Sequence, residues 1–269
     1  MSPSPAAMRS DPLKTWPHRY RAMLADHQLD AGQILDESLD IPDLNRPAIF
    51  SLAQALENPD LLRQQIAEDY PGAAGQDTVA RLSVLQLNLM LSVLFPLTLQ
   101  LFRHGASPLP EPERIFLATM DKEKPRDYRW FLAPGGKIGG VPDFVDETAA
   151  QLEDWYRVFR QPLGVSPGAF WSNAALALGA PFSAVWNRAG ATDVCDMADE
   201  WLREFNCPAH RHMEWLPAGE GPGKVAIPQR RGCCLDFRLP GGRYCGTCGV
   251  HRKKRLAARE LIRDSRNTL

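Results

Sequence analysis

The chain has 269 residues, of which 44% are hydrophobic and 23% are charged, and its net charge is −1. This length allows one large domain or two small ones, and the apolar fraction is sufficient for a buried core. A chain so close to neutral is not a polyanion binder as a whole, and six cysteines are too few for a secreted disulfide scaffold.

The N-terminal part of the chain predicts a short tail followed by helices. Residues 1–12 are rich in Pro, Ser and Ala and lack the apolar run of a signal peptide, so we expect them to be disordered. An amphipathic helix is expected over residues 16–29. The pair Asn58-Pro59 is typical of a helix start, which predicts a second helix to about Tyr70.

The longest apolar segment, residues 82–102, contains no charged residue. It is long enough to span a bilayer. Six polar residues and Pro96 interrupt it, however, so a buried helix over about 77–103 is the expectation that we prefer. Pro96 should kink this helix because it lacks an N–H group and clashes one turn back, and Gly105 should end it.

Strand-like runs at residues 114–120 and 128–133 flank the charged turn 121–125, and they predict a β-hairpin. Apolar periodicity and capping residues then predict four more helices, over residues 144–159, 167–178 after Ser166, 181–187, and 192–205 with Thr192 or Asp193 as the cap. The fold class expected is mainly α with a small β insertion (α+β), in which a helical body over residues 13–207 carries a C-terminal module.

Residues 208–232 are rich in Pro and Gly and show no periodicity, so we expect a linker between the body and the module at residues 233–269. A basic helix is expected from Val250 onward. Residues 230–266 hold eleven Lys and Arg against three acids, a local charge of +8 against −9 for the rest of the chain. This imbalance indicates an anionic ligand or partner near the module, or a solvated basic helix.

The module contains four of the six cysteines in the pattern C-C-x₁₀-C-x₂-C, which are Cys233, Cys234, Cys245 and Cys248. A centre held by thiolates alone is usually zinc or iron–sulfur. The turn residues Pro240-Gly241-Gly242 bring the second pair back to the first. The two isolated cysteines, Cys195 and Cys207, are expected to be plain buried thiols.

The adjacent pair favours iron–sulfur over zinc. Neighbouring side chains of a strand point to opposite faces, so both sulfurs reach one centre only if the backbone turns, which Gly232 would ease. A binuclear cluster accepts more ligand directions than one tetrahedral zinc, and structural zinc sites typically use two separated C-x₂₋₄-C pairs. Zinc and a vicinal disulfide remain the alternatives.

The segment Arg-Arg-Gly-Cys-Cys-Leu-Asp-Phe-Arg-Leu-Pro-Gly-Gly-Arg-Tyr-Cys-Gly-Thr-Cys resembles the C-terminal signature of the FhuF-type ferric-siderophore reductases. The stretch Phe170-Trp171-Ser172-Asn173-Ala174 is similar to a tryptophan–asparagine stretch of that family's central region. One departure is Gly249-Val250, where a proline would be expected soon after the last cysteine.

This resemblance implies a [2Fe–2S] cluster held by Cys233, Cys234, Cys245 and Cys248, through which the electron passes. The implied enzyme is an oxidoreductase acting on metal ions, which reduces siderophore-bound Fe(III) to Fe(II) in the cytoplasm, with peripheral attachment to the inner membrane face as an option. The implied partners are a ferric siderophore and an electron donor such as a ferredoxin or a reduced flavin or NAD(P)H system, with no nucleic acid. Candidate substrate contacts are Trp171, Arg231 and Arg243.

Two other functions stay open at this point. One is a zinc-stapled binding module whose basic helix contacts nucleic acid or a protein partner. The other is an iron–sulfur sensor or assembly protein without a siderophore substrate. The pair His210 and His212 could hold a second metal, although ordinary loop histidines are the expectation that we prefer.

Overall fold

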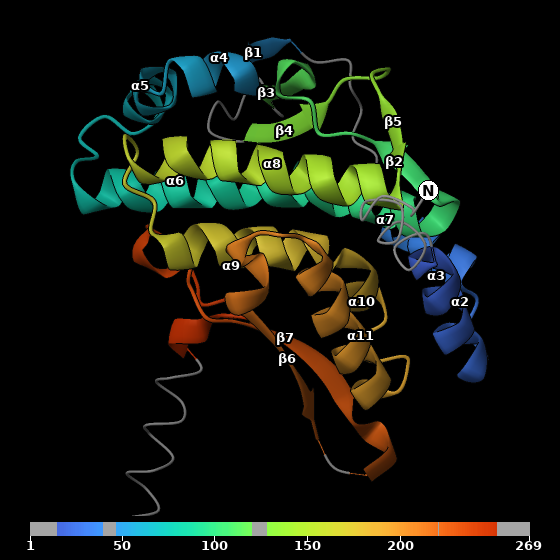
Figure 1. Cartoon of the computed structure of the whole chain (residues 1–269). Coiled ribbons are helices and arrows are strands. Elements are labelled where there is room, and N and C mark those ends of the chain that lie inside the picture. The colour runs from blue at the N-terminus through green and yellow to red at the C-terminus, as the bar shows by residue number, and fades with distance from the viewer. Residues whose placement is uncertain (1–14, 40–46, 120–127, 220, 252–269) are drawn as a thin grey trace, which may run out of the picture.

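A computed structural model of the chain describes residues 15–39, 47–119, 128–219 and 221–251 (Figure 1). The expected disordered tail, the charged turn of the first hairpin and the basic C-terminal helix beyond His251 lie outside these residues. The described part is mainly helical with three small antiparallel sheets, so the expected fold class is confirmed.

The expected buried helix runs through the middle of the molecule as α6 (Gln76–Leu89), the π-helical turn η1 (Met90–Leu94) and α7 (Phe95–His104). The widened turn ends two residues before Pro96, where the helix must accommodate a residue that cannot donate a backbone hydrogen bond. Gly105 ends α7 in the left-handed conformation with φ 78°, as expected.

This helix is also the one part of the described chain that is long and apolar enough to cross a membrane. It has 29 residues and a mean hydropathy of 1.8, and 61% of its most apolar window is buried within the protein. Buried core helices pass the same test of length and composition, and the burial agrees with the expectation of a core helix.

The other elements surround this helix in layers. In Figure 1, α8 (Val141–Arg160) lies beside it, α9 (Pro167–Leu178) lies below both, and a three-stranded sheet lies above them. The strands of that sheet are in the order β1 (Ala48–Ser51), β3 (Ile115–Thr119), β4 (Tyr128–Leu132). The remaining elements are α2 (Trp16–Asp26), α3 (Ala31–Ser38), α4 (Leu52–Glu57), α5 (Asp60–Asp69), β2 (Ala106–Pro108), η2 (Pro112–Arg114), β5 (Ile138–Gly140), α10 (Ala180–Ala184), α11 (Ala191–Glu204), η3 (Pro208–Arg211) and η4 (Gly221–Gly223).

The expected first hairpin is confirmed, since β3 and β4 pair antiparallel with Ile115 opposite Leu132 and Leu117 opposite Trp130. One face of the sheet packs on the core through the buried side chains of Ile115, Leu117 and Trp130. The strand β1 and the two-stranded sheet of β2 and β5 were not expected from the sequence.

The expected linker at residues 208–232 is wrong. Its central part is a second hairpin, in which β6 (Met213–Ala218) pairs antiparallel with β7 (Val225–Arg230) and packs on α11. Each strand of a two-stranded sheet has a free edge, so Pro217 and Pro228 fit without a lost ladder bond. The hairpin anchors on the core through the buried Met213 and Trp215, so the chain enters the cysteine module from a fixed strand.

Candidate metal centre

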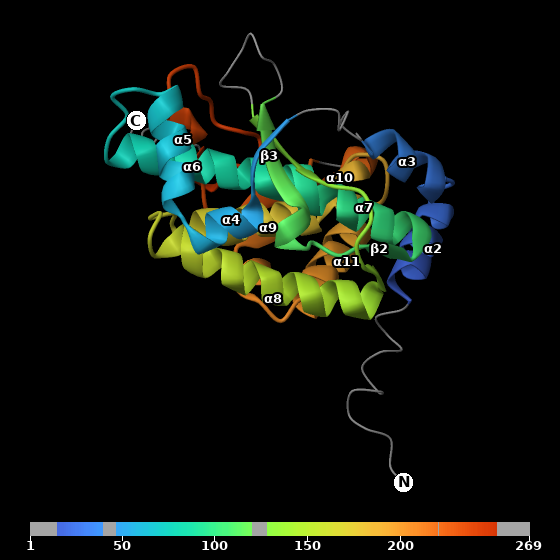
Figure 2. The same cartoon turned by 90° about the horizontal axis from the view of Figure 1, so that it is seen from above.

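The cysteine module lies against the helical body, close to the first turns of α6 and α9. Figure 2 shows this end of the chain beside α5 and α6. A 3₁₀ turn, η5 (Asp236–Arg238), follows the first cysteine pair, and Nη1 of Arg238 donates a 3.0 Å hydrogen bond to Oε1 of Gln76 at the start of α6. The backbone N–H of Arg230 donates to the carbonyl oxygen of Thr247 at 2.9 Å, which closes the loop onto the end of β7.

The backbone turn at the adjacent pair is made by Leu235, which has a φ of 68° in the left-handed region directly after Cys234. Gly232, which was expected to ease that turn, instead allows a close approach to the body, because a Cβ there would overlap the carbonyl oxygen of Gly168 in the first turn of α9. Gly249 also lies too close to other backbone for a side chain, in this case at Arg230 and Arg231. Glycine at both positions therefore serves the packing of the loop.

The four cysteine sulfurs form one connected group. The Cys248 thiol donates to the Cys233 sulfur across 3.4 Å, and Cys233 donates in turn to its neighbour Cys234. Cys234 and Cys245 both accept from Nη2 of Arg230, at 3.6 and 2.9 Å. Two sulfurs that share one tetrahedral metal at about 2.3 Å stand about 3.8 Å apart, so the spacing of Cys233 and Cys248 is already close to that of two ligands on one metal.

Arg230, the last residue of β7, places a positive charge inside the protein, because it is only 1% exposed. Its Nη1 donates to Oδ1 of Asn173, and its Nε is buried without a hydrogen-bond partner among the described groups. Burial by itself would lower the pKa of this guanidinium, but the sulfurs of Cys245 and Cys234 outweigh it, and the pKa lies above its ordinary value. A buried cation with a spare donor is stable beside a negative group, and a thiolate-bound metal centre supplies one.

A buried polar chain links Arg230 to the central helix. Asn173 of α9 donates through Nδ2 to Oε1 of Gln86 on α6 across 2.6 Å, and both residues are fully buried. Asn173 thus orients the guanidinium beside the sulfurs. This role of Asn173 and Gln86 was not expected from the sequence, where the available signal was a pair of amides within apolar helical segments.

The pKa values of the two adjacent cysteines are shifted in opposite directions. The pKa of Cys234 lies well below its ordinary value, because Cys233 donates a hydrogen bond to its sulfur and the charge of Arg230 favours the thiolate. The pKa of Cys233 is raised for the matching reason, since it donates that bond and is buried. The thiolate is the form that binds metal, so Arg230 favours metal binding by stabilising the thiolate of Cys234.

Among the residues that the structure describes, no group of three or more His, Cys, Asp or Glu side chains lies in a metal-binding arrangement. The cysteine sulfurs nevertheless contact one another in series, Cys248 with Cys233 and Cys233 with Cys234, and Arg230 bridges Cys234 and Cys245. Four thiolates would be a complete ligand set for a [2Fe–2S] cluster, and the buried guanidinium would offset part of the negative charge of such a centre. The donor set and its buried cation therefore fit a four-cysteine [2Fe–2S] cluster.

Comparison with protein families matches residues 230–248 to the FhuF 2Fe-2S C-terminal domain. Residues 230–248 are a FhuF-type [2Fe–2S] domain. The match begins at Arg230 and ends at Cys248, so it contains all four cysteines and the buried arginine, and the cofactor is a [2Fe–2S] cluster. The resemblance seen in the sequence is confirmed for this domain. No curated protein matches the chain.

The three candidate substrate contacts lie in different environments. Trp171 is 2% exposed and packs against Tyr156 and Phe170, so the expectation that it contacts substrate is corrected, and its ring belongs to the core. Arg231 is exposed on the loop that enters the domain. Arg243 is also exposed, and it lines a hollow beside the cysteine module.

The isolated cysteines and histidines have structural surroundings. Cys195 and Cys207 are buried free thiols, and burial raises the pKa of each to about 11, as expected for inert core cysteines. Nδ1 of His210 lies 3.1 Å from the carbonyl oxygen of Cys207, and the carbonyl oxygen of His212 accepts from the N–H of Arg231. Neither histidine belongs to a metal-binding group within the described residues.

Proposed function

We propose that this protein is a ferric-siderophore reductase, which passes one electron to siderophore-bound Fe(III) and so releases Fe(II) in the cytoplasm. When bound, a four-cysteine [2Fe–2S] cluster accepts and gives up one electron at a time. The observation that carries the proposal is the FhuF-type domain with a ligand edge at the surface. Cys245 is exposed, whereas Cys233, Cys234 and Cys248 are buried.

Reduction is sufficient to free the iron. Siderophores offer oxygen anions, whose attraction for the metal rises with its charge, so Fe(II) is held more weakly than Fe(III). The step transfers one electron and needs no general acid, base or nucleophile. What the protein must supply is a close approach of the chelate to the cluster and a suitable reduction potential.

The residues around the sulfurs serve the second requirement. Arg230 donates to Cys234 and Cys245, and the backbone N–H of Leu235 donates to the Cys233 sulfur at 3.4 Å. Both the positive charge and the hydrogen bonds favour the more negative reduced state and raise the potential. The electron itself comes from a reduced ferredoxin or a reduced flavin or NAD(P)H system, and peripheral attachment to the inner membrane face would place the protein beside siderophore uptake.

The proposal is tested with protein purified without oxygen. The protein is reduced with dithionite, freed of excess reductant and mixed with a ferric chelate and a ferrous-specific dye. The expected result is a reddish-brown protein that bleaches on reduction and recolours with the chelate while one Fe(II) appears per cluster.

Two outcomes contradict the proposal. A colourless protein that holds one zinc ion excludes electron transfer and favours the binding module. A cluster that stays reduced in the presence of every ferric chelate tested favours a sensor or assembly protein.

A further inference from the structure

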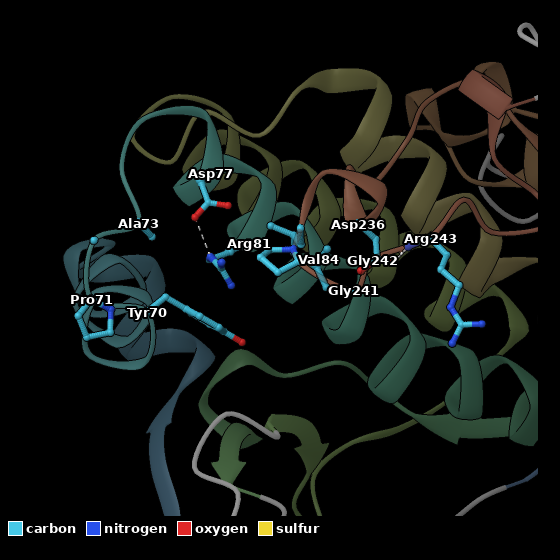
Figure 3. Close-up of a pocket in the computed structure, with 13 residues that line it drawn as sticks. Tyr70, Pro71, Ala73, Asp77, Arg81, Val84, Asp236, Gly241, Gly242 and Arg243 are labelled. Carbon is cyan, nitrogen blue, oxygen red and sulfur yellow. Dashed lines mark hydrogen bonds and ion pairs between the residues drawn. The ribbon is translucent and has the colours of Figure 1, made fainter.

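A hollow of about 760 Å³ lies between the connection from α5 to α6 and the cysteine module. Figure 3 shows Tyr70 and Arg81 on the helical side, and Asp236 and Arg243 on the side of the module. The volume lies within the range of about 300–1,000 Å³ that is typical of small-molecule sites.

One wall of the hollow is the loop that carries the cluster. Asp236 is two residues from Cys234, and Arg243 is two residues from Cys245. Two residues span at most about 7 Å, so a molecule in the hollow lies close to the ligand loop. The exposed ligand, Cys245, is the one nearest in sequence to Arg243. The hollow therefore offers the close approach that electron transfer to a chelate requires.

The helical wall presents a flat cationic surface. The side chain of Arg81 is 11% exposed, and its Cζ lies 3.5 Å from the ring centroid of Tyr70. Nε of Arg81 donates to Oδ2 of Asp77 at 3.1 Å. Among the described residues, no hydrogen bond uses Nη1 or Nη2 of Arg81, so both nitrogens can bind a ligand. A guanidinium held flat by an aromatic ring and one carboxylate is well placed to bind an oxygen anion through its free edge.

The wall on the module side provides a second cation and an open rim. Asp236 is occupied by the backbone N–H of Arg243 at 3.0 Å, and no described residue forms an ion pair with the Arg243 guanidinium. At Gly72 and Gly241 an added Cβ would meet nothing within 4 Å, so no side chain narrows the rim there. Both acids of the hollow are thus engaged, while the arginines keep donors free.

We propose that this hollow is the docking site of the ferric chelate, and that its two arginines select chelates of net negative charge with exposed carboxylate or phenolate oxygens. The identity of the ligand rests on the proposed function, whereas the site itself follows from the cavity, its arginines and its place on the cluster loop. Arg81 and Arg243 hold opposite sides of the chelate, and the cluster lies beyond the wall formed by the module.

The test uses gallium(III) citrate, an anionic chelate that does not take up an electron under these conditions, so binding is read separately from reduction. Equilibrium dialysis against the holoprotein is expected to show binding to the wild type. Arg243→Glu should weaken it by roughly tenfold or more, as expected for a lost charged hydrogen bond. Ala73→Trp, which fills the hollow, should abolish it. The matched control is Arg203→Glu on the exposed face of α11, which should bind as the wild type does.

Absorption spectra confirm that each variant keeps its cluster and its fold. The site is refuted if the wild type does not bind gallium citrate, if Arg203→Glu weakens binding as much as Arg243→Glu, or if Ala73→Trp binds normally. Selection by charge is refuted if a neutral gallium trihydroxamate binds as tightly as the citrate. Failure of the proposed function looks different, because the reduced cluster then survives every ferric chelate whether or not gallium citrate binds.

Discussion

Replacing Arg230 with glutamine is expected to lower the midpoint potential of the cluster. The guanidinium donates to two ligand sulfurs, at 2.9 and 3.6 Å, and is 1% exposed, so water screens its charge poorly. A unit charge about 5 Å from the added electron contributes about 3 kcal/mol at an effective dielectric constant of about 20. Since about 59 mV corresponds to 1.4 kcal/mol for a one-electron couple, the expected decrease is on the order of 100–150 mV.

The measurement is a redox titration followed by electron paramagnetic resonance, with iron and sulfide content checked in each variant. Arg231→Gln is the matched control, because it removes the same charge from the next residue, which is exposed. Its potential should shift several-fold less, and that shift should disappear at high salt, where exposed charges are screened. Arg230→Lys keeps the charge but loses the planar guanidinium, whose Nη2 contacts both sulfurs while its Nη1 contacts Asn173, so its potential should lie between those of the wild type and Arg230→Gln.

The reasoning is refuted if Arg230→Gln retains a full cluster at the wild-type potential. It is also refuted if Arg231→Gln lowers the potential by the same amount, since the effect would then depend on net charge and not on the buried contact.

Three further predictions concern the domain and its attachment. Cys245→Ser should lose the cluster and the activity together, as measured by iron content and chelate reduction, and a variant that keeps both would contradict the ligand assignment. Gly232→Ala should lower both the cluster content and the melting temperature, because the added methyl group overlaps the Gly168 carbonyl oxygen. Gly246→Ala is the control, since its methyl group meets nothing within 4 Å, and equal melting temperatures of the two variants would refute this reasoning. Asn173→Ala should lower the free energy of unfolding in urea by about 2–4 kcal/mol, because Nη1 of the buried Arg230 and Oε1 of the buried Gln86 both lose their hydrogen-bond partner; a loss below about 1 kcal/mol would argue against the buried chain.

The helical body could be predicted from the sequence because its signals are local. Apolar spacing and capping residues placed α8 and α9, and Gly105 marked the end of α7. The β6–β7 hairpin was missed because its prolines suggested a linker, although Met213 and Trp215 alternate as an inward-facing strand should. Prolines are acceptable there because each strand has a free edge, which a single sequence does not reveal.

The site was predicted in part for a similar reason. Cysteine spacing indicated four candidate ligands, since that pattern is contained in one short segment. The contacts of Arg230 with Asn173 join residues 57 positions apart, and they depend on how α9 packs against the end of β7. Trp171, two residues before that asparagine, is a candidate substrate contact from the sequence because an aromatic ring suits both a core and a binding face. Its packing against Tyr156 places it in the core.

The unequal exposure of the four cysteines makes one side of the proposed cluster more open to oxidation than the other. In the proposed reductase, the exposed sulfur of Cys245 would offer the electron its route to the surface, and it would also be the ligand that dioxygen or peroxide reaches first. Oxidative damage to the cluster should therefore start at Cys245, while Cys233, Cys234 and Cys248 remain protected by burial.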